Sequence, residues 1–462
     1  MSSPVHSAGL SGGFVVGAIQ QLINELTGRV RLPIEALSNA PTGDVLEPRG
    51  DEQRRGADAI ERIVDGLTGG RRDVDPQAAR GARPLLATAR VQGTGAGGVT
   101  RLTFDADAPT ADFMVGGRES AMVAIYVDGR YHSSAIVFGE RRGAIEVNLG
   151  SLPAGPHVVE LRAATDVAPV RARVGTVRAT TIAGDAALAD RFAPVIELRD
   201  TDRSSRSSVA RSDVPLVVVP AITRNADGTR TIEYRMLYSN EDGGTTTTDL
   251  FAKYGRGVDA EPVYRVTVDA AGRLVEGRYQ AALHRWLRFD GERVGERAVL
   301  RISTANNMVS ARRGAARSER WSDAPTAPID PRESEYATMR ANPWTWSVMA
   351  KELLREGKAA AEGGLRGAKQ VGDPRRYLYL GPLSDAARAA IQLRGGVEVV
   401  LSDGRRVLAR LAKGFAAGTF RQSALELPPD ALVDSIRGVA LLGVRALVLD
   451  AGFGIRELAH AT

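Results

Sequence analysis

The side chains that could do chemistry are concentrated in one stretch of the chain, which contains an acidic motif and a histidine between aromatic residues. Asp259 and Glu261 are two positions apart, so on a strand both carboxylates point to the same side. His284 follows in a segment whose alternation places Trp286 on the same strand face. Two carboxylates can cleave a glycosidic bond, and an imidazole beside an acid can transfer a proton near neutral pH.

The aromatic residues concentrate in the same region. Half of them, including all four tryptophans, fall between residues 230 and 346. Aromatic rings cover the C–H faces of sugars while polar groups bond the hydroxyls, so we predict a site for a polysaccharide or cell-surface glycan. If the protein is an enzyme, the predicted catalytic residues are Asp259, Glu261, Tyr264 and His284. The predicted ligand-binding residues are Asp249, Tyr254, Arg285, Trp286, Asn306, Asn307 and Trp344.

Each of these residues also has a purely structural interpretation, which the sequence leaves open. His284 could bond a backbone carbonyl at a strand edge, and the two acids could pair with Arg256 and Arg265 on a solvated face. The amides of residues 306 and 307 could cap a turn. Of the two tryptophans that flank Thr345, we expect one to anchor a helix to the core and the other to line a cleft.

Metal and cofactor signals are few. The run Asn240-Glu-Asp-Gly-Gly244 offers oxygen ligands for Ca²⁺, but it lacks the spacing of a twelve-residue calcium loop and also fits a solvated hairpin tip. The chain has no cysteine, which excludes disulfides and thiolate ligands. It contains no nucleophile elbow, phosphate loop, zinc-helix motif or dinucleotide fingerprint. We therefore expect no cofactor, with Ca²⁺ as the exception.

Composition narrows the class of protein. At 462 residues the chain is long enough for several domains. Only five of its 61 basic residues are lysines, which is typical of a GC-rich bacterial genome. Arginines are interspersed with acidic residues along the chain and form no long basic stripe, so we expect no nucleic-acid partner. No run of 18 apolar residues occurs, so we expect no membrane span.

The hydrophobic period changes from helical to strand-like near residue 87. Helical patterns cover residues 14–26, 51–67 and 345–355, and hairpin patterns cover residues 121–138 and 397–411, each around an Asp-Gly turn. We predict a mainly β, multidomain protein built of antiparallel β-sandwiches, with a short helical N-terminal region and one helix before the C-terminal domain. The predicted parts are a helical lead-in (1–85), an accessory sandwich (86–185), a central β domain with the candidate site (186–345), a helix and linker (346–378) and a C-terminal sandwich (379–462).

Two resemblances add to this interpretation. The phrase from Ala189 to Leu198, followed by residues 234–240 and the acidic phrase at 259–261, resembles the vacuolar protein sorting-associated protein 62 family. In that family a histidine often precedes the acidic phrase, and here none does; the family implies no established chemistry. Residues 125–131 and 152–163 resemble jelly-roll accessory domains found beside carbohydrate-active enzymes.

Taken together, these patterns favour an exported bacterial protein that binds a polysaccharide or cell-surface glycan through its central domain. One alternative is a glycan-degrading hydrolase or lyase with its site in the same domain. The other is an assembly protein that uses its N-terminal helices. The start of the chain lacks the positive residues of a signal peptide, although residues 9–23 are uncharged, so a cytoplasmic location stays open beside an extracellular or envelope one. The oligomeric state is not predictable from these patterns.

Overall fold

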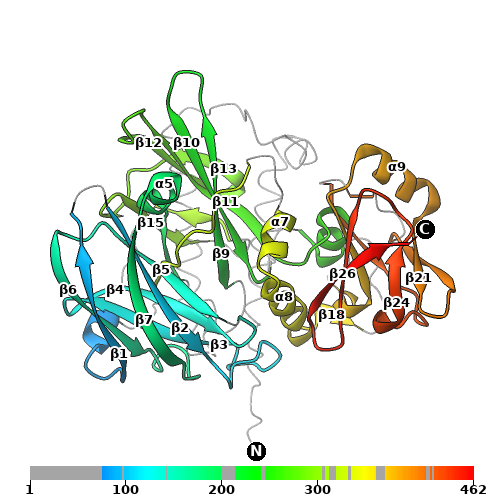
Figure 1. Cartoon of the computed structure of the whole chain (residues 1–462), viewed down its shortest axis with the longest axis horizontal. Coiled ribbons are helices and arrows are strands. Elements are labelled where there is room, and N and C mark those ends of the chain that lie inside the picture. The colour runs from blue at the N-terminus through cyan, green and yellow to red at the C-terminus, as the bar shows by residue number, and fades with distance from the viewer. Residues whose placement is uncertain are drawn as a thin grey trace, which may run out of the picture. The chain divides into compact units, whose positions relative to one another are not determined.

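The computed structural model describes residues 75–95, 98–141, 143–198, 214–240, 245–303, 307–311, 319–330, 335–360, 370–412, 417–418 and 421–461. The helices predicted at residues 14–26 and 51–67 lie outside these ranges. The described part of the chain is mainly β, as predicted, with several antiparallel or mixed sheets and few helices (Figure 1).

The first strands form a sandwich. Its two layers have the strand orders β1-β6-β3-β4 and β5-β2-β7, and their inward-facing residues share one apolar core that includes Phe104, Ile125 and Val147. Such a core forms because alternate residues of each strand point inward. The strands are β1 (Leu85–Gly93), β2 (Val99–Asp107), β3 (Ser120–Val127), β4 (Arg130–Phe138), β5 (Ala144–Gly150), β6 (Gly155–Ala163) and β7 (Arg173–Ile182).

The hairpin predicted over residues 121–138 is confirmed by β3 and β4. Asp128 and Gly129 form its turn with φ angles of 50° and 76°. A two-residue turn of this kind needs left-handed backbone at both positions, which Asp tolerates and Gly adopts freely.

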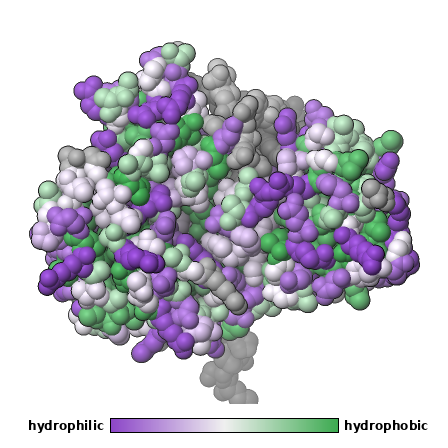
Figure 2. All heavy atoms as spheres, viewed as in Figure 1, coloured by the Kyte–Doolittle hydropathy of each residue, from purple (hydrophilic) through white to green (hydrophobic). Residues whose placement is uncertain are grey.

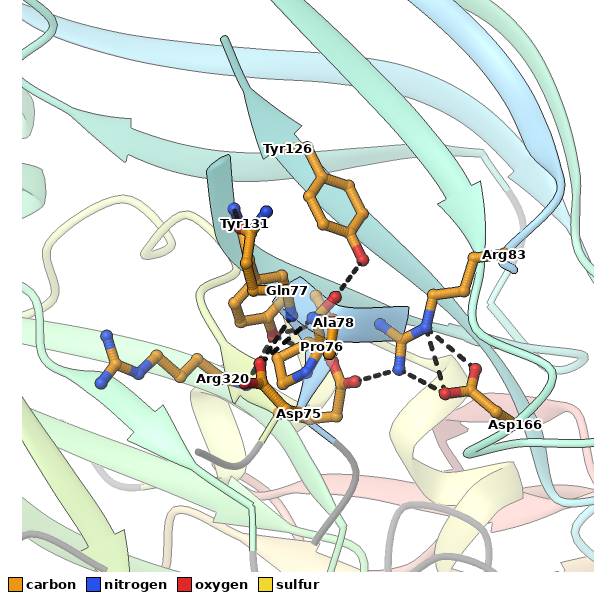
Figure 3. Close-up of polar contacts among 11 residues, drawn as sticks. Asp75, Pro76, Gln77, Ala78, Arg83, Tyr126, Tyr131, Asp166 and Arg320 are labelled. Atoms are coloured by element: carbon orange, nitrogen blue, oxygen red, sulfur yellow. Dashed lines mark hydrogen bonds and ion pairs between the residues drawn. The ribbon is translucent and has the colours of Figure 1, made fainter. Parts of the chain in front are cut away.

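Residues 75–83, the first that the structure describes, contact this sandwich through hydrogen bonds and ion pairs (Figure 3). The helix α4 (Pro76–Ala79) is capped by Asp75, and the Tyr126 hydroxyl donates to the Pro76 carbonyl at 2.6 Å. Arg83 is only 2% exposed and donates to the carboxylates of Asp166 and Glu319. A buried guanidinium needs such partners, so these contacts hold the segment in one position.

One layer of the sandwich continues into strands from later in the chain. The full order is β1-β6-β3-β4-β17-β8-β15-β14, and β16 pairs with β15. Strands from both sides of the boundary predicted at residue 185 therefore pair within one sheet. The added strands are β8 (Val195–Glu197), β14 (Arg293–Val294), β15 (Arg297–Ile302), β16 (Val309–Ser310) and β17 (Arg320–Trp321).

The phrase that resembles the sorting-protein family lies at this junction. It spans the end of helix α5 (Gly184–Phe192) and strand β8. The Asp190 carboxylate is fully buried and accepts from Arg101 Nε at 2.7 Å and Nη2 at 2.6 Å, and Phe192 packs in the core. In this structure the phrase therefore joins the sandwich to the central strands.

A five-stranded antiparallel sheet carries the candidate site. Its strand order is β13-β12-β11-β10-β9. In Figure 1, β10, β12 and β13 are labelled in the upper part of the view. Ile232, Tyr234 and Met236 alternate with Glu233 and Arg235 along β10, so one face packs on the core and the other is polar. The strands are β9 (Pro215–Arg224), β10 (Arg230–Tyr238), β11 (Asp259–Val268), β12 (Leu274–Ala281) and β13 (Arg285–Arg288).

Few helices accompany these sheets. The helix predicted over residues 345–355 is confirmed by α8, which begins at Trp344. Helix α8 spans Trp344–Arg355. The helical elements not yet described are α6 (Thr247–Asp249) with the π-helical turn η2 (Leu250–Tyr254), α7 (Glu335–Ala341), α9 (Asp385–Arg394), and the single 3₁₀ turns η3 (Ala282–His284), η4 (Pro374–Arg376) and η5 (Val433–Ser435). A small parallel pair joins β18 (Ala359–Ala360) to β19 (Val371–Gly372). None of the described helices is long and apolar enough to cross a membrane.

The C-terminal strands differ from the predicted sandwich in one respect, because they close into a barrel. The hairpin predicted over residues 397–411 is present as β21 and β22, but parallel pairing of β24 with β26 closes the sheet on itself. The strands are β20 (Tyr377–Gly381), β21 (Gly396–Leu401), β22 (Arg406–Arg410), β23 (Ser423–Glu426), β24 (Ile436–Val439), β25 (Arg445–Leu449) and β26 (Ile455–His460).

Hydrophilic and hydrophobic side chains are interspersed over the described residues on the face shown in Figure 2. The hydropathy of that face therefore does not single out a binding surface, and the candidate site has to be built from individual contacts.

Candidate functional site

The turn between β12 and β13 positions His284. The hairpin is closed by Ala282, Leu283 and His284, and the last two have φ angles of 64° and 55°. Left-handed backbone is uncommon for Leu, and residues held in such regions cluster at functional sites. Because β12 pairs with β11, this turn lies beside the first residues of β11, where Asp259 and Glu261 stand.

The structure brings Glu261 and His284 together, as predicted. Oε2 of Glu261 lies 3.6 Å from Nδ1 of His284, with 13% of the glutamate side chain and 59% of the histidine side chain exposed. The neighbouring carboxylate raises the pKa of His284 above its ordinary value. The pair can therefore present a charged donor and a carboxylate acceptor to solvent, and it can transfer a proton.

Asp259 lies deeper than Glu261. It is 3% exposed, and its Oδ2 accepts from Nδ2 of Asn307 at 2.9 Å. Burial, together with the charge of Glu261, raises the pKa of Asp259 to about 7. A glycosidase needs both carboxylates to reach the scissile bond, so a carboxylate this buried does not fit the predicted two-acid mechanism.

Gln280 belongs to the group but was not predicted from the sequence. With its amide nitrogen facing the two acceptors, it donates to Oε2 of Glu261 at 2.9 Å and to the Pro262 carbonyl at 3.1 Å. It pairs across the strands with Trp286, so both side chains lie on the same sheet face. Only the hairpin register could have revealed Gln280, because nothing in its own sequence neighbourhood distinguishes it.

Trp286 is half-buried on the polar outer face of the sheet. The guanidinium carbon of Arg265 lies 4.4 Å from the centre of its ring, and Nη2 of the same arginine donates to Glu233 at 2.6 Å. Arg265 therefore pairs with Glu233 rather than with Glu261, the partner that the structural interpretation of the acids proposed. We call Glu261, Arg265, Gln280, His284 and Trp286 the outer-face cluster.

Tyr264, predicted to be catalytic, lies on the opposite face of β11 from its neighbour Arg265. Its side chain is fully buried, its ring stacks on that of Tyr234 at 6.1 Å, and its hydroxyl accepts from Nη2 of Arg293 at 3.2 Å. The prediction grouped this ring with the acids because they are close in the sequence, whereas strand alternation next to Arg265 places it on the core face.

Other predicted ligand-binding residues are engaged elsewhere. Asp249 accepts from Thr246 and forms an ion pair with Lys253 at 3.0 Å. Tyr254 lies under the guanidinium of Arg256, with 5.1 Å between the guanidinium carbon and the ring centre. Both contacts occur within residues 246–256, so they explain the two side chains without a ligand.

Two further residues that were predicted to bind a ligand, Trp344 and Arg285, also lie outside the outer-face cluster. Trp344 stacks on Phe138 at 5.3 Å and is covered by Arg141, so it packs against the sandwich instead of lining a cleft. Arg285 is half-buried, and strand alternation places its side chain on the opposite face from Trp286. The expectation that one of the two helix-start tryptophans anchors α8 is met by Trp346, which is fully buried.

Asn306 and residues 241–244 of the acidic run lie outside the described residues. Asn240, the first residue of that run, is 1% exposed and therefore is not part of a solvated hairpin tip. Among the residues that the structure describes, no three His, Asp or Glu side chains form a group suited to a metal ion.

Comparisons with known proteins identify no family. No protein-family model matches the chain, and no curated protein matches its sequence. One similar solved structure is the crystal structure of a GH2 beta-galacturonidase from Eisenbergiella tayi bound to galacturonate, with 11% sequence identity and a TM-score of 0.15. The match covers 36% of this chain and 24% of that chain, and a TM-score this low does not indicate a shared fold. The two resemblances noted in the sequence therefore stay predictions.

Proposed function

We propose that the protein binds a polysaccharide or cell-surface glycan at the outer-face cluster. The observation that carries the proposal is the position of Trp286, which shares one sheet face with Gln280 and lies within cation–π distance of Arg265. A glycan site needs an apolar ring beside several hydrogen-bonding groups, and this face supplies both within adjacent strands.

The hydrogen-bonding groups of the cluster are complementary to hydroxyls. Glu261 is an acceptor and Arg265 is a donor, and the imidazole of His284 supplies an N–H donor in either protonation state. The exposure of His284, at 59% of its side chain, lets a large ligand reach it from solvent. A sugar hydroxyl both donates and accepts, so it could bridge the Glu261 carboxylate and the His284 ring.

The same geometry favours retention of a glycan over its hydrolysis. Of the two predicted catalytic acids, Glu261 keeps 13% of its side chain exposed, whereas Asp259 is 3% exposed. Binding without turnover requires no second carboxylate at the bond. We extend the proposal to the location of the protein, which would work outside the cell or in the cell envelope, where such glycans are found, and without a nucleic-acid partner.

A glycan array followed by affinity electrophoresis with the full chain tests the proposal. Trp286→Ala should weaken retention about tenfold, which corresponds to about 1.4 kcal/mol of lost contact. Trp344→Ala is the matched control, because that half-buried tryptophan stacks on Phe138 away from the cluster, and it should retain glycans like the wild type.

Two outcomes would contradict the proposal. One is that the wild-type chain retains no glycan on the array. The other is that Trp286→Ala and Glu261→Gln both retain glycans as tightly as the wild type. Incubation of the retained glycan with the protein also separates binding from catalysis, because new reducing ends or unsaturated sugars would show that the protein cleaves its ligand.

A further inference from the structure

Three arginines lie side by side across the five-stranded sheet. Arg265 of β11 is directly opposite Arg278 of β12, and Arg278 is directly opposite Arg288 of β13. Residues that face each other on neighbouring antiparallel strands project from the same sheet face, with their Cβ atoms about 5 Å apart. We call Arg265, Arg278 and Arg288 the arginine row.

The arginine row is adjacent to the aromatic ring of the outer-face cluster. Trp286 is two residues from Arg288 on β13, and Gln280 is two residues from Arg278 on β12, so both lie on the same face as the row. The guanidinium carbon of Arg265 lies 4.4 Å from the centre of the Trp286 ring. A sugar that packs on this ring would therefore place its substituents beside guanidinium groups.

The row becomes more accessible towards the edge of the sheet. The exposed fractions of the Arg265 and Arg278 side chains are 32% and 35%. Arg288 is exposed, and its strand β13 is the edge strand of the sheet. A polymer in solution can therefore reach the row along this edge.

Carboxylates of the protein balance only part of this positive charge. Glu233 accepts from Arg265 at 2.6 Å and from a second arginine of β10 at 2.9 Å, and Glu276 accepts from Arg278 at 3.1 Å. Within the part of the chain that the structure describes, Arg288 forms no ion pair. Like charges directly opposite each other destabilise a pair of strands, so an anion between Arg278 and Arg288 would stabilise the sheet.

We propose that the arginine row binds the anionic groups of an acidic glycan, either uronic acid carboxylates or sulfate esters, while Trp286 packs on a sugar ring. A guanidinium presents two parallel N–H donors that match two oxygens of a carboxylate or a sulfate. This inference rests on the glycan binding proposed above and narrows it to glycans that carry negative charge.

The experiment measures the affinity of the full chain for immobilised polymers by surface plasmon resonance. Alginate, a polymer of uronic acids, is compared with alginate whose carboxyl groups have been reduced to alcohols, and dextran sulfate is compared with dextran. The chain should bind at least one anionic polymer about tenfold or more tightly than the neutral counterpart, because several exposed ion pairs contribute. The pair of polymers that shows the difference distinguishes carboxylate from sulfate recognition.

Variants test whether the arginine row makes these contacts. Arg288→Gln should weaken binding of the preferred anionic polymer about threefold, and the double variant Arg278→Gln/Arg288→Gln about tenfold, as expected for exposed ion pairs. Arg288→Gln should not lower the Tm, since it relieves repulsion between neighbouring arginines. Arg437→Gln is the matched control, because it removes the same charge from an exposed position on β24 of the C-terminal barrel, and its binding should equal that of the wild type.

The proposal is overturned if the wild-type chain binds neither anionic polymer more tightly than its neutral counterpart, a result that does not depend on any variant folding. It is also overturned if Arg437→Gln weakens binding as much as Arg288→Gln, since the net charge of the whole chain would then attract the polymer. A chain that binds neutral glycans alone would contradict this proposal and leave glycan binding at the outer-face cluster intact, whereas a chain that binds no glycan of either kind would contradict both.

Discussion

Glu261 and His284 face each other at the same end of the five-stranded sheet, with 3.6 Å between Oε2 and Nδ1. The distance is that of an ion pair and is longer than a hydrogen bond. Leu283 and His284, in the turn between β12 and β13, both have left-handed backbone. The hairpin itself therefore holds the imidazole near the carboxylate. This relationship defines the outer-face cluster and supports the proposed site.

Glu261→Gln should lower the pKa of His284 towards its ordinary value, because the carboxylate that favours the protonated ring is removed. The chain has only five histidines, so ¹³C-histidine NMR titration can follow each ring. His157 pairs with Asp128 elsewhere and serves as the internal control, with an unchanged titration. An unchanged pKa of His284 would mean that the two side chains do not interact in solution.

Tyr264 should behave as a core residue. Tyr264→Ala should cost about 3 kcal/mol or more in the free energy of unfolding, because a fully buried ring is removed. Tyr264→Phe should cost only about 1 kcal/mol, since it loses one hydrogen bond from Arg293. Urea unfolding measures both effects. Glycan retention by Tyr264→Phe should equal that of the wild type. A large loss of retention would show that the tyrosine hydroxyl belongs to the binding site.

The two tryptophans at the start of α8 should differ in their contribution to stability. Trp346→Ala should lower the free energy of unfolding by about 3–5 kcal/mol, since its buried ring contacts Tyr379 at 4.8 Å and Tyr336 at 5.7 Å. Trp344→Ala should cost roughly 1 kcal/mol, because that ring is half-buried and makes one stacked contact. Equal losses in thermal or urea unfolding would contradict the arrangement of α8.

His132 should make the protein less stable in mild acid. Burial, together with the charges of Arg297 and Arg320, lowers the pKa of His132 to about 4. In the unfolded chain a histidine titrates near pH 6.5, so between these values the unfolded state binds more protons and stability falls as pH falls. The loss should reach about 3 kcal/mol by pH 4. His132→Gln should flatten this part of the curve of stability against pH.

His157 provides a control of opposite sign for that measurement. Its pairing with Asp128 raises the pKa of His157, so its contribution is fully present below the unfolded value and is lost as pH rises through the folded value. His157→Gln should therefore lower stability by a constant amount in mild acid and leave stability unchanged above the folded pKa, so that only the slope near neutral pH differs from the wild type. If His132→Gln and His157→Gln change the slope of the curve over the same pH range, the assigned protonation states are incorrect.

Much of the architecture could be predicted from local patterns. Strand alternation together with an Asp-Gly turn predicted the hairpin of β3 and β4, and a helical stripe predicted α8 within one residue of its start. These features are predictable because side-chain spacing and turn chemistry act over a few neighbouring residues. The proximity of the acids at 259 and 261 to His284 was also predicted, since all three fall on one short succession of strands.

The composition of the site depended on tertiary structure. A bulge in β11 shifts its register with β10 beyond Tyr264, and the hairpin brings Gln280 to Glu261. Packing of α8 on the sandwich took Trp344 away from the candidate site. Register, bulges and the docking of distant elements are set by contacts between residues far apart in the chain, so local residue patterns do not determine which side chains end as neighbours.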